Sequence, residues 1–180
     1  MCQEAGLVRR NVSLLMIAPN KSTSFLCGDT TAGTDPNRSN AFIQALAGIQ
    51  TVSKNKYLTK LLIEKGKNTT EVWDSIIEKL GSVQHLEFLT REEKDIFRTA
   101  SEISPKDIID LASIRQQYLD MSQSLNLYNR PDYKLKDIYD IHMYALSKDI
   151  KTLYYLYPQS HAAFEQSNDE KWDTCVSCAD

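Results

Sequence analysis

The stretch Lys151-Thr-Leu-Tyr-Tyr-Leu-Tyr-Pro158 predicts a strand near the end of this chain, and the other elements are considered outward from it. Aromatic and β-branched residues between a lysine and a proline are typical of a strand, and the sequence loses that character after Pro158. Successive side chains of a regular strand point to opposite faces, so the alternation predicts one buried and one exposed ring for Tyr154 and Tyr155. A second hypothesis is that both phenols carry one-electron chemistry. That chemistry needs the two rings in contact, and therefore a departure from the ideal pleat.

The segments before this stretch predict a crossover connection. Ser122–Tyr128 reads Ser-Gln-Ser-Leu-Asn-Leu-Tyr and alternates polar with apolar residues, which predicts a strand. Residues 135–147 carry an apolar stripe at helical spacing, which predicts a helix. Strand, helix and strand in this order form a βαβ unit with parallel strands, so at least the end of the chain is predicted to be α/β.

The middle of the chain is predicted to be rich in helices. Segments with helical spacing or helix-start signals cover residues 57–66, 68–81, 90–97 and 104–119. Asn68 with Glu71, and Thr90 with Glu93, each resemble a capping box. Residues 41–52 are mildly apolar and predict a strand or a hairpin.

Near the start, Ser13–Ile17 is a short apolar run that predicts a strand buried on both faces. Pro19-Asn-Lys-Ser-Thr-Ser24 follows, and residues 28–40 are predicted to be a loop. Serine and threonine are favoured helix N-caps, and a helix N-terminus presents free backbone N–H groups. Two interpretations of Pro19–Ser24 remain open, a plain capped turn and a site for a phosphate group.

Length and composition limit the class of protein. A chain of 180 residues with a net charge of −3 fits one domain of ordinary composition. The small acidic excess argues against a nucleic-acid binder that relies on a basic surface. No signal peptide and no membrane span are visible, because the apolar run Leu14–Ala18 is too short for either. We therefore expect a cytoplasmic protein with no nucleic-acid or membrane partner.

The end of the chain is polar and acidic, and we predict a flexible tail over residues 159–180. It ends in Cys175-Val-Ser-Cys178. One Cys-x-x-Cys pair could be half of a zinc site, but the chain offers no second pair to complete four ligands. A dithiol on a mobile tether suits thiol–disulfide exchange, so we expect redox use and no metal site. The alternative is a non-catalytic module that binds phosphate or metal.

Taken together, these segments resemble the C-terminal part of the large, catalytic subunit of class I ribonucleotide reductase. Four segments carry the resemblance, and they run from one end of the chain to the other: Leu14–Ser24, Ser122–Tyr128, Lys151–Tyr155, and the final pair Cys175 and Cys178. The resemblance implies a ten-stranded α/β barrel of two parallel half-barrels, of which residues 1–158 would supply the last strands and their helices. Residues 159–180 would be the redox tail.

The resemblance also implies roles for individual residues. The loop formed by Pro19, Asn20, Lys21, Ser22 and Thr23 would bind the diphosphate of a ribonucleoside diphosphate. Lys21 stands where such families often have an acidic or small residue.

By the same resemblance, Tyr154 and Tyr155 would relay a radical from the small subunit toward an active-site cysteine, with Tyr154 nearer the substrate. Cys175 and Cys178 would reduce the active-site disulfide formed at each turnover and would themselves be reduced by a thioredoxin or glutaredoxin.

One departure from the family pattern stands out. The family's radical-bearing cysteine, its redox-active cysteine pair and its allosteric sites would all lie upstream of Met1. We therefore expect the chain to be inactive alone and to need an N-terminal fragment of the large subunit and a small subunit. We expect the small subunit to carry the metal and tyrosyl-radical cofactor and this chain to hold no cofactor itself. It would be either an excised piece or the product of a split gene, as in some phages, in which case it would work in the host cytoplasm. Met1 just before the first strand favours a natural start.

Overall fold

The computed structural model describes residues 11–20, 23–24, 27, 31, 33–46 and 49–158. Its helices and strands are β1 (Ala41–Leu46), β2 (Ile49–Lys54), α2 (Lys56–Glu64), α3 (Thr70–Glu78), α4 (Arg91–Ile96), the 3-10 turn η1 (Ala100–Glu102), α5 (Pro105–Gln116), β3 (Leu127–Asn129), α6 (Leu135–Ser147) and β4 (Leu156–Pro158). They belong to two compact units, one made mainly of residues 36–103 and one made of residues up to 35, 104–127 and 132–157. The predicted tail, with Cys175 and Cys178, lies outside the described residues.

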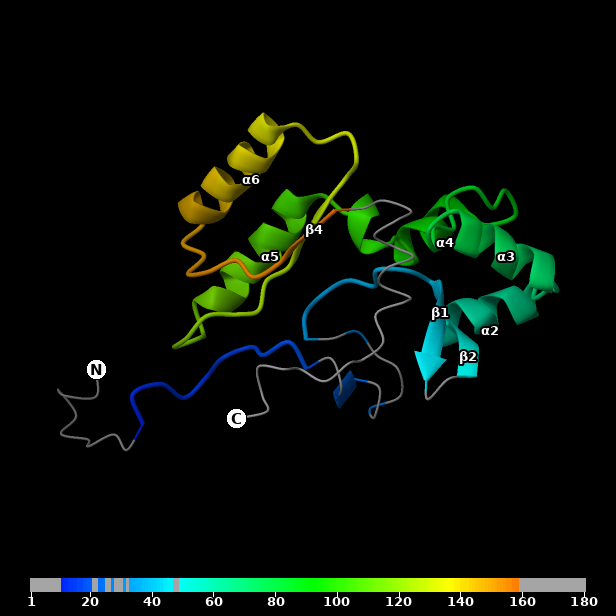
Figure 1. Ribbon diagram of the computed structural model, residues 1–180, viewed down its shortest axis with the longest axis horizontal. Coiled ribbons are helices and arrows are strands. Elements are labelled where there is room, and N and C mark those ends of the chain that lie inside the picture. Colours follow the sequence, from blue (N-terminus) through cyan, green and yellow to red (C-terminus); the bar gives the residue numbers. More distant parts are fainter. Residues whose placement is uncertain are drawn as a thin grey trace. The chain divides into compact units, whose positions relative to one another are not determined.

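The unit built from residues 36–103 contains a hairpin and short helices. β1 and β2 pair antiparallel, in a register that runs from Ala41 opposite Lys54 to Leu46 opposite Ile49, and α3 lies against β1 (Figure 1). Its core is formed by buried apolar side chains from the hairpin, the helices and the turns between them: Ala41, Leu58, Leu62, Trp73, Ile76, Val83, Leu86, Leu89 and Phe97. The predicted hairpin and the helix-rich middle are therefore confirmed.

Local signals explain where these helices begin. Thr90 and Glu93 form the predicted reciprocal capping box at the start of α4. The capping box predicted at Asn68 is wrong, because α3 begins one residue later, after Thr69. The Asn68 side chain instead accepts a hydrogen bond from the Trp73 indole at 2.8 Å, which fixes the largest buried ring of this core.

The other unit consists of parallel segments backed by two helices. α5 and α6 lie side by side (Figure 1), joined through the Tyr144 hydroxyl, which donates to both Asp110 carboxylate oxygens at 2.8 and 3.0 Å. Ser104 caps α5 by accepting from the Lys106 N–H, and Pro105 occupies the first turn. α6 spans the predicted residues, Leu135–Ser147.

Three chain segments of this unit run parallel. The first ends at Ile17, the middle segment runs from Gln123 to Leu127, and the third leads into β4. Ile17 pairs with Gln123 in a parallel bridge, where Ile17 donates to Ser122 C=O at 3.4 Å and Ser124 donates to Ile17 C=O at 2.9 Å. On its other side the middle segment pairs with the segment that leads into β4, and β3 and β4 form one sheet. α6 connects these two segments, so the predicted βαβ crossover is present.

Three of the predicted strands differ from the structure. The predicted strand Ser122–Tyr128 is reduced to a bridge at Gln123 and to β3, which begins only at Leu127. In Ser13–Ile17 only Ile17 forms a bridge, and Leu14, Leu15 and Met16 are 64%, 56% and 55% exposed, so the prediction of burial on both faces is wrong. The reason is that within the described residues this segment is paired along one edge and is not covered. In the C-terminal stretch, β4 is limited to Leu156–Pro158, and the two adjacent tyrosines precede it.

Candidate functional site

The turn after α5 holds the starts of all three parallel segments. The Asp120 carboxylate accepts hydrogen bonds from the backbone N–H groups of Leu14 and Leu15, at 3.0 and 3.3 Å. The Lys151 ammonium group donates to the carbonyl groups of Leu119 and Asp120, at 3.3 and 2.6 Å. These contacts fix the first and third segments on either side of the middle one and therefore align their carboxyl ends.

The middle segment is anchored to α5 by a buried amide. Gln123 is 2% exposed and donates to Ala112 C=O at 2.8 Å and to Gln116 Oε1 at 3.3 Å. Its oxygen accepts from the Arg115 guanidinium at 3.2 Å. After Gln123 the backbone makes a tight turn, in which the Leu125 N–H donates to Gln123 C=O at 2.9 Å, and Leu125, Asn126 and Leu127 are all buried.

The end of α6 is held in a similar way. Lys148 contacts Asp110 at 2.7 Å, and its backbone carbonyl accepts from the Ser113 hydroxyl at 3.0 Å. The hydrogen bond from Lys148, and then that from the Tyr144 hydroxyl, hold the pKa of the Asp110 carboxyl below its usual value. The same hydrogen bond from Lys148 to Asp110 raises the pKa of Lys148. The tyrosine segment leaves α6 from this fixed point.

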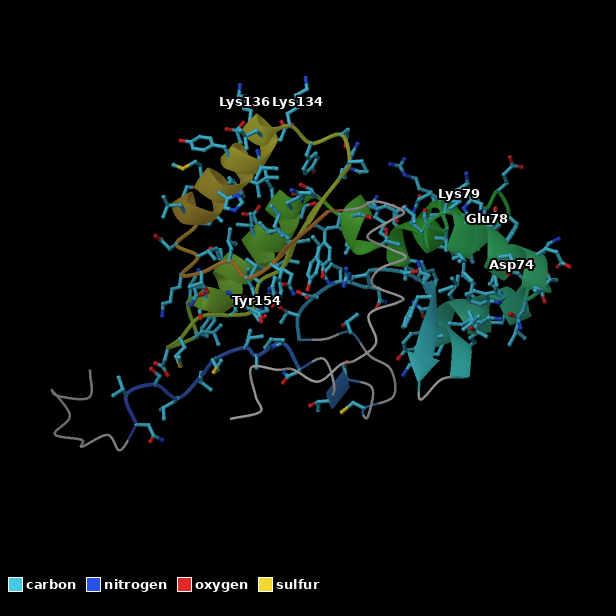
Figure 2. The ribbon with its side chains drawn as sticks, viewed as in Figure 1. Asp74, Glu78, Lys79, Lys134, Lys136 and Tyr154 are labelled. Carbon is cyan, nitrogen blue, oxygen red and sulfur yellow. The ribbon has the colours of Figure 1, made fainter. Side chains whose placement is uncertain are left out.

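The segment Lys151–Tyr155 contains a bulge at the two tyrosines (Figure 2 labels Tyr154). The Tyr154 N–H donates to Leu125 C=O at 2.9 Å, and Tyr155 C=O accepts from the Leu127 N–H at 2.9 Å. In a regular parallel pair one residue would make both bonds opposite Asn126, so here two residues stand opposite one. The extra backbone N–H, that of Tyr155, donates to the Asn126 side-chain oxygen at 3.2 Å.

The bulge brings the two phenol rings together. The ring centroids of Tyr154 and Tyr155 lie 4.1 Å apart with planes tilted by 51°, and the side chains are 51% and 50% exposed. The alternation that predicts one buried and one exposed ring is therefore wrong, and the hypothesis that requires ring contact agrees with the geometry. Tyr157 was not among the predicted site residues, and its ring lies 5.6 Å from that of Tyr155.

The loop after Ile17 reaches the same edge of the sheet. Ser24 donates to Asn20 C=O and Cys27 donates to Thr23 C=O, both at 3.1 Å, and the described residues Thr23 and Ser24 are helical. Pro19, Asn20 and Thr23 are exposed, and Lys21 and Ser22 lie outside the described residues. Ile17 is level with Gln123, whereas the tyrosines stand opposite Asn126, farther toward the carboxyl ends where this loop begins. Carboxyl ends of parallel strands are where α/β proteins bind their ligands.

A second turn packs against this loop. Gly33 has a φ of +57°, and a side chain there would meet Ala18 C=O at 3.1 Å, so the turn approaches the backbone of Ala18 and Pro19 as closely as glycine allows. Asp35, directly after this turn, accepts a hydrogen bond from the Asn126 amide. Burial lowers the pKa of Arg115, while the nearby Asp35 carboxylate acts in the opposite direction.

Within the described residues no group of three or more histidine, cysteine or acidic side chains could hold a metal ion. No helix in the described part of the chain is long and apolar enough to span a membrane.

Comparison with known proteins places the chain in a family. The ribonucleotide reductase barrel domain matches residues 3–156, and the chain belongs to this family. It is 37% identical over 155 residues to the ribonucleoside-diphosphate reductase large subunit of Invertebrate iridescent virus 6, a match that covers 84% of this chain and 16% of that protein. It is 34% identical over 174 residues to the putative large subunit of Frog virus 3, where the match covers 94% of this chain and 31% of that protein.

A solved structure agrees with this assignment. The class Id ribonucleotide reductase alpha subunit of Actinobacillus ureae superposes with a TM-score of 0.76 and 40% sequence identity, over 91% of this chain and 29% of that one. The chain therefore spans less than a third of the length of these relatives. The expected fold, a C-terminal portion of the reductase barrel, is confirmed at this level.

Proposed function

We propose that this chain supplies part of the catalytic large subunit of a ribonucleoside-diphosphate reductase, which makes deoxyribonucleotides for DNA synthesis. The observation that carries the proposal is the bulged pair Tyr154 and Tyr155, with rings 4.1 Å apart, on the same sheet edge as the loop that begins at Pro19. A radical relay needs two oxidisable rings in contact, and a diphosphate needs a loop with free backbone N–H groups.

In this proposal Pro19, Asn20, Lys21, Ser22 and Thr23 bind the substrate diphosphate. Tyr155 receives the radical from the small subunit and Tyr154 passes it toward an active-site cysteine on the rest of the large subunit. Each step exchanges one electron and one proton between neighbouring phenols, so that one tyrosine is restored as the next is oxidised.

The tail closes the redox cycle. Reduction of one ribonucleotide releases its 2′-hydroxyl as water and oxidises two active-site thiols to a disulfide. Cys175 and Cys178 reduce that disulfide by thiol–disulfide exchange and become a disulfide themselves. A thioredoxin or glutaredoxin then supplies the electron pair that restores them.

The exposed apolar segment explains why other chains are required. Val12, Leu14, Leu15 and Met16 are each more than half exposed, on a segment paired along one edge within the described residues. Exposed apolar side chains beside an open sheet edge favour pairing with another polypeptide. We propose that the remaining part of the large subunit covers this edge, that the radical arises on a metal-containing small subunit, and that the assembly works in the cytoplasm.

Reconstitution tests the relay. The chain is mixed with the complementing part of a large subunit, a small subunit, a ribonucleoside diphosphate and a dithiol, and deoxynucleotide formation is measured. Tyr154→Phe and Tyr155→Phe should each reduce turnover to the level without small subunit, because phenylalanine keeps the ring but cannot be oxidised in its place. Tyr57→Phe, at an exposed position in the other unit, is the control and should retain activity. Full activity of either relay variant would refute the relay.

A second assay tests the tail. Cys175→Ser should abolish turnover driven by thioredoxin and leave turnover driven by a small dithiol intact, because a small reductant reaches the active-site disulfide directly. Equal loss with both reductants would contradict the shuttle. Stoichiometric bound zinc without any turnover would favour the metal-binding alternative.

A further inference from the structure

The Asn126 side chain makes two contacts, one to the bulge at Tyr154 and Tyr155 and one to Asp35, which follows the turn at Gly33. Its oxygen accepts the Tyr155 N–H at 3.2 Å, and its amide nitrogen donates to Asp35. Asn126 is 4% exposed and both contacts are partly buried, so an unmet polar group of its side chain would be costly.

The first contact satisfies the group that the bulge would leave without a ladder partner. The neighbouring backbone bonds use the N–H of Tyr154 and the C=O of Tyr155, and the N–H of Tyr155 lies between them. A bulge needs a partner for its extra residue, and the side chain standing opposite provides it. Without this partner, the regular pairing would favour a pleat in which adjacent rings point to opposite faces.

The second contact determines which way the amide faces. Asp35 is an acceptor when ionised, so it selects the Asn126 nitrogen and leaves the oxygen to face Tyr155. Asp35 is itself placed by the turn at Gly33, which packs against Ala18 and Pro19.

We infer that Asn126, oriented by Asp35, is the positioning residue that holds the rings of Tyr154 and Tyr155 in contact and couples them to the Pro19 loop. This inference rests on the proposed function, because it concerns the geometry of the relay. Asn126 touches neither substrate nor a reacting atom in this account. It acts through the backbone of Tyr155.

An exchange of the two side chains tests the inference in the reconstituted enzyme. Asn126→Asp places a second carboxylate against Asp35, so the two repel and the oxygen facing Tyr155 is displaced. Asp35→Asn combined with Asn126→Asp restores one amide and one carboxylate, so that the new carboxylate at position 126 accepts from both the new amide at position 35 and the Tyr155 N–H. Asp35→Asn alone keeps an acceptor but adds a donor at position 35, so it weakens the selection of the Asn126 nitrogen and should lower kcat less than Asn126→Asp.

The expected result is a kcat at least about tenfold lower for Asn126→Asp with the KM for the ribonucleoside diphosphate within about twofold, and a kcat within about threefold of wild type for the double exchange. Asn126→Ala should lose kcat in the same way, and Asp35→Asn should not rescue it. This pattern separates positioning from a general structural defect, which the second substitution would not repair.

Three outcomes would overturn the inference: an Asn126→Asp kcat within about twofold of wild type, a double exchange no better than the single variant, or a rise in KM with unchanged kcat. If Asn126→Asp does not assemble, the double exchange and Asn126→Ala decide the matter by the same criteria. Tyr155→Phe is measured in parallel. Full activity of Tyr155→Phe refutes the relay itself, whereas an inactive Tyr155→Phe beside a normal Asn126→Asp refutes only the positioning role.

Discussion

Replacing Gln123 with methionine should destabilise the chain through lost hydrogen bonds rather than lost packing. Methionine has a similar volume and no amide, so the substitution removes the polar contacts and leaves the buried site filled. Gln123 is 2% exposed and makes contacts with Ala112, Gln116 and Arg115. It is the side chain that joins the middle parallel segment to α5.

The magnitude follows from those contacts. A neutral hydrogen bond contributes about 0.5–1.5 kcal/mol net, and one to a charged group about 1.5–3 kcal/mol. The bond at 3.3 Å to Gln116 is long, and the Arg115 guanidinium can regain water. We therefore expect a loss of about 2–3 kcal/mol in the free energy of unfolding, below the simple sum.

Urea unfolding of the full chain, followed by circular dichroism, measures this loss as a lower midpoint at an unchanged slope. Gln84→Met is the matched control. Gln84 is exposed and donates to Lys94 C=O at 3.0 Å, so its replacement should change stability by less than about 0.5 kcal/mol. If the two variants lose the same amount, the reasoning that buried Gln123 anchors the middle segment is wrong.

Three further predictions concern the fold. Gly81→Ala should lower the free energy of unfolding by at least about 2 kcal/mol, because φ is +82° and the new Cβ would lie 1.9 Å from the Ser39 hydroxyl. Gly66→Ala is the control and should lose about 1 kcal/mol, because φ is +65° and nothing lies within 4 Å of the new Cβ. Equal losses in thermal unfolding would contradict this prediction. Asn40→Ala should lose about 2–4 kcal/mol, because it removes the buried amide that donates to Gly81 and Phe97 carbonyls at 2.9 and 2.7 Å, and a loss below about 1 kcal/mol in urea would refute its role. The lowered pKa of Asp110 means that its carboxylate stabilises the fold above the usual pKa of about 3.8, and that this contribution disappears as the pH falls through the lower pKa of the folded state. Wild type should therefore lose more stability than Asp110→Asn as the pH falls from about 5 into the acid range. Parallel pH profiles of the two proteins would contradict the contact with Lys148.

Much of the fold follows from local sequence signals. Ser104 and Pro105 mark the start of α5, the apolar stripe of residues 135–147 gives the bounds of α6, and the strand–helix–strand order gives the parallel crossover. Each of these depends on residues close together in the chain, where capping and periodicity act.

The geometry of the tyrosines could not be derived in this way. Strand alternation separates the rings of Tyr154 and Tyr155, and the bulge that joins them depends on Asn126, 29 residues earlier, and on Asp35, 91 residues before Asn126. The exposure of Leu14–Met16 also escapes local reasoning, because an apolar run signals burial without saying which chain provides the cover. Contacts that are distant in sequence leave no periodic signal.

The central claim is that a radical passes through Tyr155. The most direct test places a tyrosine analogue that is easier to oxidise at position 155, assembles the chain with the complementing large-subunit part and the small subunit, adds substrate, and records electron paramagnetic resonance spectra. If the radical passes through Tyr155, a new radical on the analogue should grow as the small-subunit radical declines. An unchanged small-subunit radical, in an assembly whose unmodified form makes deoxynucleotides, would contradict it.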